Sequence, residues 1–285
     1  MTEQLPNQQS ECLLRPAATF FGAEVGDLAD LGSDKVAFCG IFCDHFGSGV
    51  PGGRFFARQL RYCSSDPWTR NALSIFSDNI VDIGDLNVYP LEPIQLGDAL
   101  RDQVGQIVQT GARPFIASGG YGLSPAIVGG VSDAIGSRDL EVIRISRFRD
   151  RDEADNESPL VVPRSQASSR LIQVLDGQEN SLQWFPNCEA VLQEPGVLSG
   201  NRPCFLSVDA DILDPVYSDT GNYRGIGGDR PDDVRSMVDH LRERKIVGAE
   251  MTGHLPSFDL HGRAVTNFTV AICASIVNLL RDEPR

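Results

Sequence analysis

The sequence predicts an α/β protein with one doubly wound, mostly parallel sheet and helices on both faces. Two observations predict this fold class. Strand-like and helix-like segments alternate along the whole chain, which is the order that builds a parallel sheet. The strand-like segments are also almost continuously apolar, as strands buried on both faces are. We expect residues 1–30 to be a partly ordered N-terminal extension and residues 31–285 to form a single domain.

Six segments are predicted as strands because they are short, apolar and rich in β-branched or aromatic residues. Each is followed by glycine or by a cluster of polar residues, which ends the strand. In chain order they are residues 35–42, 79–86, 113–120, 140–146, 203–211 and 245–251. Because ligands of such sheets bind at the carboxyl ends of the strands, we expect functional residues to follow these segments.

Four segments have the spacing of apolar residues that is typical of amphipathic helices. They are residues 97–111, 124–136, 230–244 and 266–282. Pro231 and Asp232 suit the first turn of the third helix, because proline fits there and the helix dipole favours acidic side chains. Gly111 suits the end of the first helix, where a left-handed residue closes the last turn. The most polar stretch, residues 147–159, is predicted to be a surface loop.

Charge and cysteine content limit the partners and the compartment. The 285-residue chain has 39 acidic and 25 basic residues and a formal net charge of -14. Such a chain has no basic field for nucleic acid or an anionic membrane, so we expect neither as a partner. Seven scattered cysteines without a CxxC pair predict a reduced, cytoplasmic protein. The first residues lack the features of a signal peptide, and no apolar run reaches transmembrane length.

The stretch FLSVDADILDP, residues 205–215, places three carboxylates after an apolar strand. Because successive side chains of a strand alternate between its two faces, Asp209 and Asp211 are predicted to point to the same face. Two adjacent carboxylates repel each other unless a positive group lies between them, and hard divalent cations prefer such oxygen ligands. The alternative is a solvated strand end with turn-forming aspartates, which Asp214 before Pro215 favours for the third one. The local pattern leaves both interpretations open.

The same stretch resembles the S-x-D-x-D-x-x-D-P motif of the ureohydrolases, the arginase, agmatinase and formimidoylglutamase superfamily. Other segments resemble further motifs of this family in the right order, from about Val36 to Leu280. They are residues 36–61 (the first strand and the G-x-P-x-D…R-P-G-A-R loop), 79–88 (D-x-G-D), 111–122 (G-G-D-H-S), 140–150 (D-A-H-x-D), 214–228 (D-P-x-x-x-P-G-T-G) and 248–259 (G-x-D-x-x-E-x-N-P). The resemblance implies the three-layer arginase-like fold and, by analogy, a homo-oligomer.

The resemblance also implies a pair of Mn²⁺ ions held by two histidines and four aspartates, but this sequence departs from that set. The histidine of G-G-D-H-S falls on Tyr121. In D-A-H-x-D the first aspartate falls on Ser146 and the histidine on Phe148. The retained ligand positions are Asp150, Asp209 and Asp211. Three carboxylates without imidazoles predict either no metal or one weakly bound Mn²⁺.

The departures extend to the groups that would face the substrate. The family's substrate-facing glutamate falls on Gly253. Without metal, the crowded carboxylates can act as a general acid or base, or can pair with a small cationic substrate. The candidate catalytic residues are Asp150, Asp209, Asp211, Tyr121 and His254, and the candidate substrate-binding residues are Asp44, His45, Ser146, Phe148 and Asn222. Because an unperturbed histidine side chain titrates near neutral pH, His45 and His254 suit acid–base catalysis, although each taken singly is more simply an exposed loop histidine.

Three functions from different classes follow. The favoured hypothesis is an enzyme of specialised metabolism that acts on a small guanidino, amidino or amine compound at a non-standard site, without a binuclear manganese centre. The second is a C–N hydrolase of the agmatinase or arginase type with one Mn²⁺. The third is a non-catalytic relative that binds a ligand or a partner. Asp150, Asp209 and Asp211 keep the residue type of the family's motifs although the other ligand positions differ, and this favours an enzyme.

Overall fold

The chain folds around a large twisted sheet. The computed structural model describes residues 18–44, 51–75, 77–88, 93–136, 140–146, 171–175, 183–185, 188, 200–217, 228–256 and 264–281. In this part of the chain, nine strands pair in the order β1-β3-β2-β4-β9-β8-β5-β6-β7. The seven strands from β1 to β5 in that order are parallel, and β6 and β7 extend the sheet in antiparallel pairing. The strands are β1 (Glu24–Val25), β2 (Val36–Ile41), β3 (Ile80–Leu86), β4 (Arg113–Ser118), β5 (Glu141–Ser146), β6 (Leu171–Leu175), β7 (Gln183–Phe185), β8 (Pro203–Asp209) and β9 (Lys245–Thr252).

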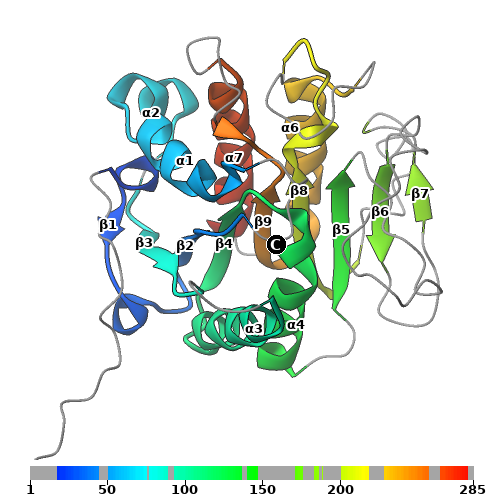
Figure 1. Ribbon diagram of the computed structural model, residues 1–285. Coiled ribbons are helices and arrows are strands. Elements are labelled where there is room, and N and C mark those ends of the chain that lie inside the picture. The colour runs from blue at the N-terminus through cyan, green and yellow to red at the C-terminus, as the bar shows by residue number, and fades with distance from the viewer. Residues whose placement is uncertain are drawn as a thin grey trace, which may run out of the picture.

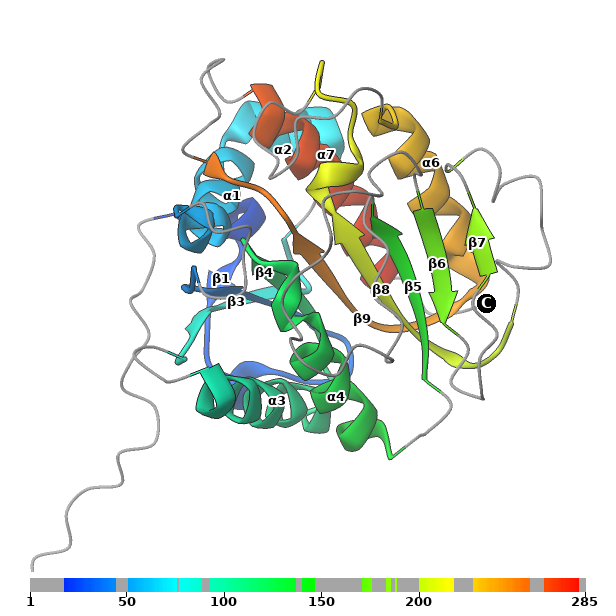
Figure 2. The same cartoon turned by 45° about the vertical axis from the view of Figure 1, so that its right-hand side comes forward.

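Helices cover both faces of the sheet and complete three layers (Figures 1 and 2). One face carries α3 (Pro93–Gln109) and α4 (Ser124–Ile135), and the other carries α1 (Phe56–Ser64), α2 (Pro67–Leu73), α6 (Pro231–His240) and α7 (Ala264–Arg281). Short 3-10 turns, among them η3 (Gly53–Phe55), η4 (Tyr121–Leu123) and η6 (Ala210–Ile212), lie where chain segments leave the strands or enter the helices. Within the described ranges, no helix is long and apolar enough to span a bilayer.

The fold class predicted from the sequence is confirmed, and the six expected strands and four expected helices are all present. Several ends differ from expectation, among them the following two. The strand expected to reach residue 211 ends at Asp209, and the helix expected to reach residue 244 ends at His240 and continues as a short 3-10 turn. The sequence pattern did not predict β1, β6, β7, α1 or α2. The segment expected as a surface loop, residues 147–159, lies outside the described residues.

Two apolar clusters, one on each face of the sheet, form the core. On the α1 and α7 face, the ring of Phe20 stacks on Phe38 with centroids 3.9 Å apart and meets Phe115 edge to face. Phe20 and Phe21 belong to the segment expected as an N-terminal extension, and both are fully buried. Burial of one phenylalanine contributes roughly 2 to 3 kcal/mol, so residues 20 and 21 help to stabilise the domain.

A buried ion network fastens α1 to β3. The guanidinium of Arg61 donates to Asp82 through Nε at 2.9 Å and through Nη2 at 3.0 Å, and to Asp85 through Nη1 at 2.6 Å. Asp82 also accepts from the backbone amides of Phe20 and Gly84. Arg61 and Asp82 are almost fully buried, so each charge depends on the other for compensation. Asp82 and Asp85, which both belong to β3, thus help to hold α1 against the sheet.

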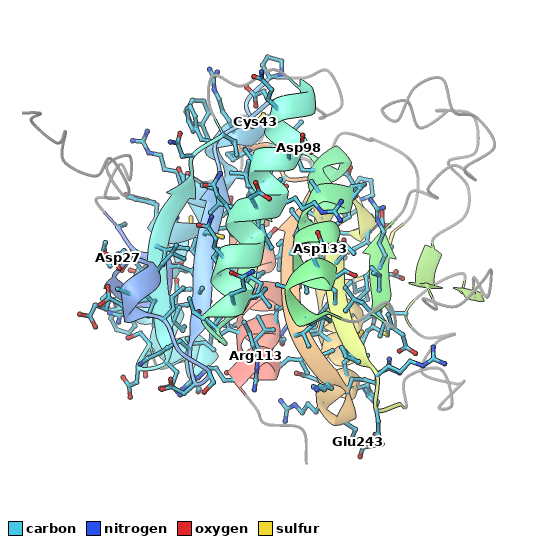
Figure 3. All side chains as sticks on the ribbon, turned by 90° about the horizontal axis from the view of Figure 1, so that it is seen from below. Asp27, Cys43, Asp98, Arg113, Asp133 and Glu243 are labelled. Carbon is cyan, nitrogen blue, oxygen red and sulfur yellow. The ribbon has the colours of Figure 1, made fainter. Side chains whose placement is uncertain are left out.

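The parallel strands bring their carboxyl ends to one edge of the sheet, which we call the carboxyl edge. Figure 3 shows Cys43, which follows β2, at this end of the molecule. Arg113, the first residue of β4, and Glu243, two residues before β9, lie at the opposite end. The segments after β2, β4, β9, β8 and β5 therefore gather at the carboxyl edge. This is where sheets of this type bind their ligands.

Candidate active site

Asp209 is the centre of the candidate site. It is the last residue of β8 and is fully buried. Its Oδ2 accepts a hydrogen bond of 3.2 Å from the hydroxyl of Ser146 at the end of β5, and its Oδ1 accepts one of 3.0 Å from the amide of Asp211. Asp209 thereby caps the 3-10 turn η6 that follows. These bonds hold the carboxylate in one orientation at the carboxyl edge.

Asp211 lies beside Asp209, but not as the sequence pattern predicted. The prediction that both side chains lie on one face of a strand is wrong, because the strand ends at Asp209 and Asp211 belongs to η6. Asp211 is 2% exposed, so the turn still places a second carboxylate in the protein interior. Asp214 accepts a hydrogen bond of 2.9 Å from the amide of Val216, which confirms the turn-forming role expected for the third aspartate.

Buried hydroxyls flank Asp209 on the neighbouring strands. Thr252 of β9 is in register with Asp209 on one side, and Ser146 of β5 lies on the other. Beyond β9, Ser118 ends β4 and donates to the carbonyl of Gly120 at 3.0 Å. These three hydroxyls are 1% exposed, and Oγ1 of Thr252 has no hydrogen-bond partner among the described residues. Sequence reasoning missed Ser118 and Thr252, although each is the polar residue that ends an apolar strand.

A second polar level lies two residues further into the sheet, beneath Asp209. Ser207 of β8 donates a hydrogen bond of 2.6 Å to Oε1 of Glu250 on β9. Arg144 of β5 is in register with Ser207 on the other side. Burial raises the pKa of Glu250, the positive charge of Arg144 lowers it, and Asp209 raises it further. The sequence contains a signal for this level that was not used: Arg144 and Glu250 are charged residues within the largely apolar segments 140–146 and 245–251.

Gly253 packs directly against Asp209. Its φ is +80°, in the left-handed region that glycine tolerates, and a Cβ atom there would lie 1.9 Å from Oδ1 of Asp209. This is the position on which the substrate-facing glutamate of the ureohydrolases falls. With this backbone, no side chain fits between residue 253 and Asp209. A substrate at this edge must therefore be recognised by other groups.

His254 is not an exposed loop residue, so that interpretation is wrong. Its side chain is fully buried between α1 and α7. The imidazole Nε2 lies 3.2 Å from the hydroxyl oxygen of Thr266, and the ring centroid lies 5.1 Å from that of Phe56. The residue follows Gly253 directly, so its backbone belongs to the carboxyl edge while its ring packs in the helical layer.

Asp44 organises the segment that follows β2. Its Oδ1 accepts hydrogen bonds from the amides of Gly52 at 3.1 Å and Arg54 at 2.8 Å, and its Oδ2 lies 3.4 Å from Nε of Arg54. Gly53 in this segment lies against Gly119 after β4, so closely that a Cβ at Gly53 would lie 2.9 Å from the Cα of Gly119. Asp44 thus fixes the chain that borders the site next to β4.

The structure brings together only some of the residues selected from the sequence. Asp209, Asp211 and Ser146 form one cluster, and Asp44 and His254 lie on adjoining segments of the same edge. The backbone of Tyr121 belongs to η4, but its side chain is outside the description. The other candidates, His45, Phe148, Asp150 and Asn222, lie outside the described residues. Within the described ranges, no three histidine, cysteine or acidic side chains are grouped as metal ligands would be.

The fold and the order of strand-end residues define the class of protein. The model of the arginase family matches residues 34–159 and 182–279, which is most of the chain. The chain belongs to the arginase family, as the resemblance of its motifs implied.

Three known proteins show the range of similarity. The chain is 23% identical over 256 residues to the mitochondrial guanidino acid hydrolase of Rattus norvegicus, covering 79% of this chain and 72% of that protein. It is 25% identical over 265 residues to the guanidinopropionase of Pseudomonas aeruginosa, covering 80% and 81%. The solved structure of proclavaminate amidino hydrolase from Streptomyces clavuligerus has the same fold, with a TM-score of 0.71, 18% identity, and coverage of 94% of this chain and 98% of that one.

Proposed function

We propose that this chain is an enzyme that acts on a C–N bond of a small guanidino or amidino compound at the carboxyl edge around Asp209. The observation that carries the proposal is the buried Asp209 carboxylate, held in one orientation by Ser146 and by its own turn, with Asp211 beside it. Relatives named for guanidino substrates support the substrate class. Family membership supports the reaction class, and the residues support a site that works differently from a binuclear metal centre.

A guanidinium group matches the chemistry of this edge. It is planar, permanently charged and rich in N–H donors, so it pairs with carboxylates by charge-assisted hydrogen bonds. Asp209 and Asp211 are buried acids, and a cation placed beside a buried carboxylate stabilises its ionised form. The hydroxyl of Thr252 lies on the strand next to Asp209 and can accept or donate a further hydrogen bond. This arrangement supports binding of a small organic cation.

The described residues do not fit a binuclear metal centre. Each oxygen of Asp209 accepts one hydrogen bond, from Ser146 or from the amide of Asp211, and keeps one further acceptor site. Ser146 stands where the family's bridging aspartate would be, and a neutral hydroxyl cannot neutralise two divalent ions as a carboxylate does. We therefore propose chemistry that uses the chain's own groups.

In that chemistry the carboxylates first orient the substrate. Hydrolysis of a guanidino group requires that a water oxygen bonds to the guanidino carbon, that one C–N bond breaks, and that the departing nitrogen takes a proton. A carboxylate beside the carbon can accept the proton of the attacking water and return it to that nitrogen.

Product release in the absence of metal tests the proposal. Protein treated with chelator is incubated with guanidino acids of increasing chain length and with agmatine, and urea and free amine are quantified. We expect release by the wild type without added metal, and loss of release in Asp209→Asn. Release that appears only after Mn²⁺ is added would instead favour a hydrolase with one metal ion bound by Asp209 and Asp211. The absence of both product release and substrate binding would favour a non-catalytic relative.

A further inference from the structure

The buried polar level beneath Asp209 has a defined geometry. Arg144 on β5 pairs in register with Ser207 on β8, and Ser207 pairs in register with Glu250 on β9. Side chains of residues in register on neighbouring strands point to the same face of the sheet. Ser207 therefore lies between Arg144 and Glu250, and its strand carries Asp209 two residues further on, on the same face. Exposure of the three side chains is 6% or less.

Arg144, Glu250 and Asp209 act as one electrostatic group. The charges of Arg144 and Asp209 both act on Glu250, with opposite effects on its pKa. Ser207 joins the two levels, because it donates to Glu250 at 2.6 Å and precedes Asp209 by two residues on the same strand. A positive charge at Arg144 is thus within electrostatic range of the acids at the candidate site.

Arginine is charged at every pH at which the protein folds, so Arg144 brings a permanent positive charge to this cluster. A buried group of acids stays ionised only if such a charge compensates it. In many acidic sites a divalent ion provides that compensation. Arg144 provides part of it through a covalently attached side chain, and it repels any second cation that approaches the same acids.

We propose that Arg144 is a built-in cation beneath Asp209 that weakens divalent metal binding at this edge and leaves the site suited to a singly charged organic cation. We rest this inference on the proposed function, because it concerns the same acids and the same substrate class. Repulsion by Arg144 is stronger for a divalent ion than for a guanidinium group, since the Coulomb energy is proportional to the charge. Arg144 is then a specificity-determining residue that acts through Asp209.

Binding of Mn²⁺ to variants of residue 144 tests the inference. Free Mn²⁺ is measured by electron paramagnetic resonance during titration of chelator-treated protein. We expect Arg144→Met to bind Mn²⁺ at least about tenfold more tightly than the wild type, and Arg144→Lys, which keeps the charge, to stay close to the wild type. Combining Arg144→Met with Asp209→Asn should abolish the gain and so assign it to this site.

Matched controls separate this effect from general changes in charge and from misfolding. Arg101 provides the charge control, because it is exposed and pairs with Asp133, which is labelled in Figure 3, and Arg101→Met should leave Mn²⁺ affinity unchanged. If the Arg144→Met protein does not fold because the charge of Glu250 is no longer compensated, Arg144→Met combined with Glu250→Met removes both charges. That double variant should bind Mn²⁺ more tightly than Glu250→Met alone.

The outcomes distinguish this inference from the proposed function. Unchanged Mn²⁺ affinity in folded Arg144→Met, or in the double variant relative to Glu250→Met, overturns the role of Arg144 even if guanidino compounds are turned over. A gain in Mn²⁺ affinity supports that role even if no guanidino compound is bound. The Mn²⁺ titration contains no substrate, so failure of one proposal does not mask failure of the other.

Discussion

Gly253 and Asp209 are in direct contact: a Cβ atom added to Gly253 would lie 1.9 Å from Oδ1 of Asp209. The close approach is possible because residue 253 has no side chain and adopts a φ of +80°. The carboxylate at the centre of the candidate site is therefore held on three sides, by Ser146, by the amide of Asp211 and by the backbone at Gly253.

Substitution of Gly253 by alanine should combine backbone strain with displacement of Asp209. We expect Gly253→Ala to lower the free energy of unfolding by about 2 kcal/mol or more and to weaken guanidino binding. Gly136 provides the matched control, because its φ is +62° and a Cβ atom added there would have no atom within 4 Å. Gly136→Ala should lower stability by only about 1 kcal/mol. Equal effects of the two substitutions in urea unfolding would refute the contact.

Removal of the Ser146 hydroxyl should loosen Asp209 without removing its charge. Ser146→Ala deletes the hydrogen bond of 3.2 Å, while the amide of Asp211 continues to donate to the other oxygen. We expect the free energy of unfolding to fall by about 1 kcal/mol. We also expect kcat to fall by a larger factor than KM rises, because the carboxylate remains but is less well oriented. Ser65→Ala, which removes an exposed hydroxyl, is the control. An unchanged kcat in Ser146→Ala would argue against an orienting role.

Breaking the Arg61–Asp82 pair should destabilise the whole domain. Both side chains are buried, so Arg61→Met leaves Asp82 without its main compensating charge and should cost about 3 to 5 kcal/mol of stability. The exposed pair of Arg101 and Asp133 offers a direct comparison, and Arg101→Met should change stability by less than about 1 kcal/mol. Denaturant unfolding measures both. Similar losses for the two variants would show that burial of the network has little energetic effect.

Glu250 should make stability depend on pH. Burial raises the pKa of Glu250 in the folded state, so the folded protein binds this proton more tightly than the unfolded chain does. The proton therefore contributes fully to stability below the ordinary glutamate pKa. That contribution is lost as pH rises from the ordinary value through the raised one. Glu250→Gln cannot ionise, so its stability relative to the wild type should increase from about pH 4 upward. Urea unfolding of both proteins at a series of pH values measures this difference, and a difference that does not change with pH would contradict the raised pKa of Glu250.

Much of the fold could be predicted from the sequence because the central parallel strands are continuous apolar runs. The antiparallel strands β6 and β7 could not, because LIQVL and QWF are short and mix polar with apolar residues. Strand β1 has two residues and no pattern at all. Helix α1 was missed because residues 56–64 contain two arginines and a glutamine among the apolar positions and follow a segment already assigned to a loop motif.

The candidate site was predicted in part. Asp209 and Ser146 could be selected because motif order places them at strand ends, and they do meet. The orientation of Asp211 could not, because a change from strand to 3-10 turn breaks the period of two. The burial of His254 depends on Phe56 and Thr266, which are distant in the chain. Arg144, Ser207 and Glu250 were overlooked because their role depends on strand order, which the sequence pattern does not specify.

The most direct test of the account is calorimetric titration of small guanidino compounds into chelator-treated protein. We expect saturable binding to the wild type and binding at least about 100-fold weaker to folded Asp209→Asn, since a charged hydrogen-bonding partner is lost. Asp232→Asn, which removes an exposed charge at the start of α6, should bind like the wild type. Wild-type protein that binds no guanidino compound, or Asp209→Asn that binds as tightly as the wild type, would contradict the assignment of this edge as a guanidino site.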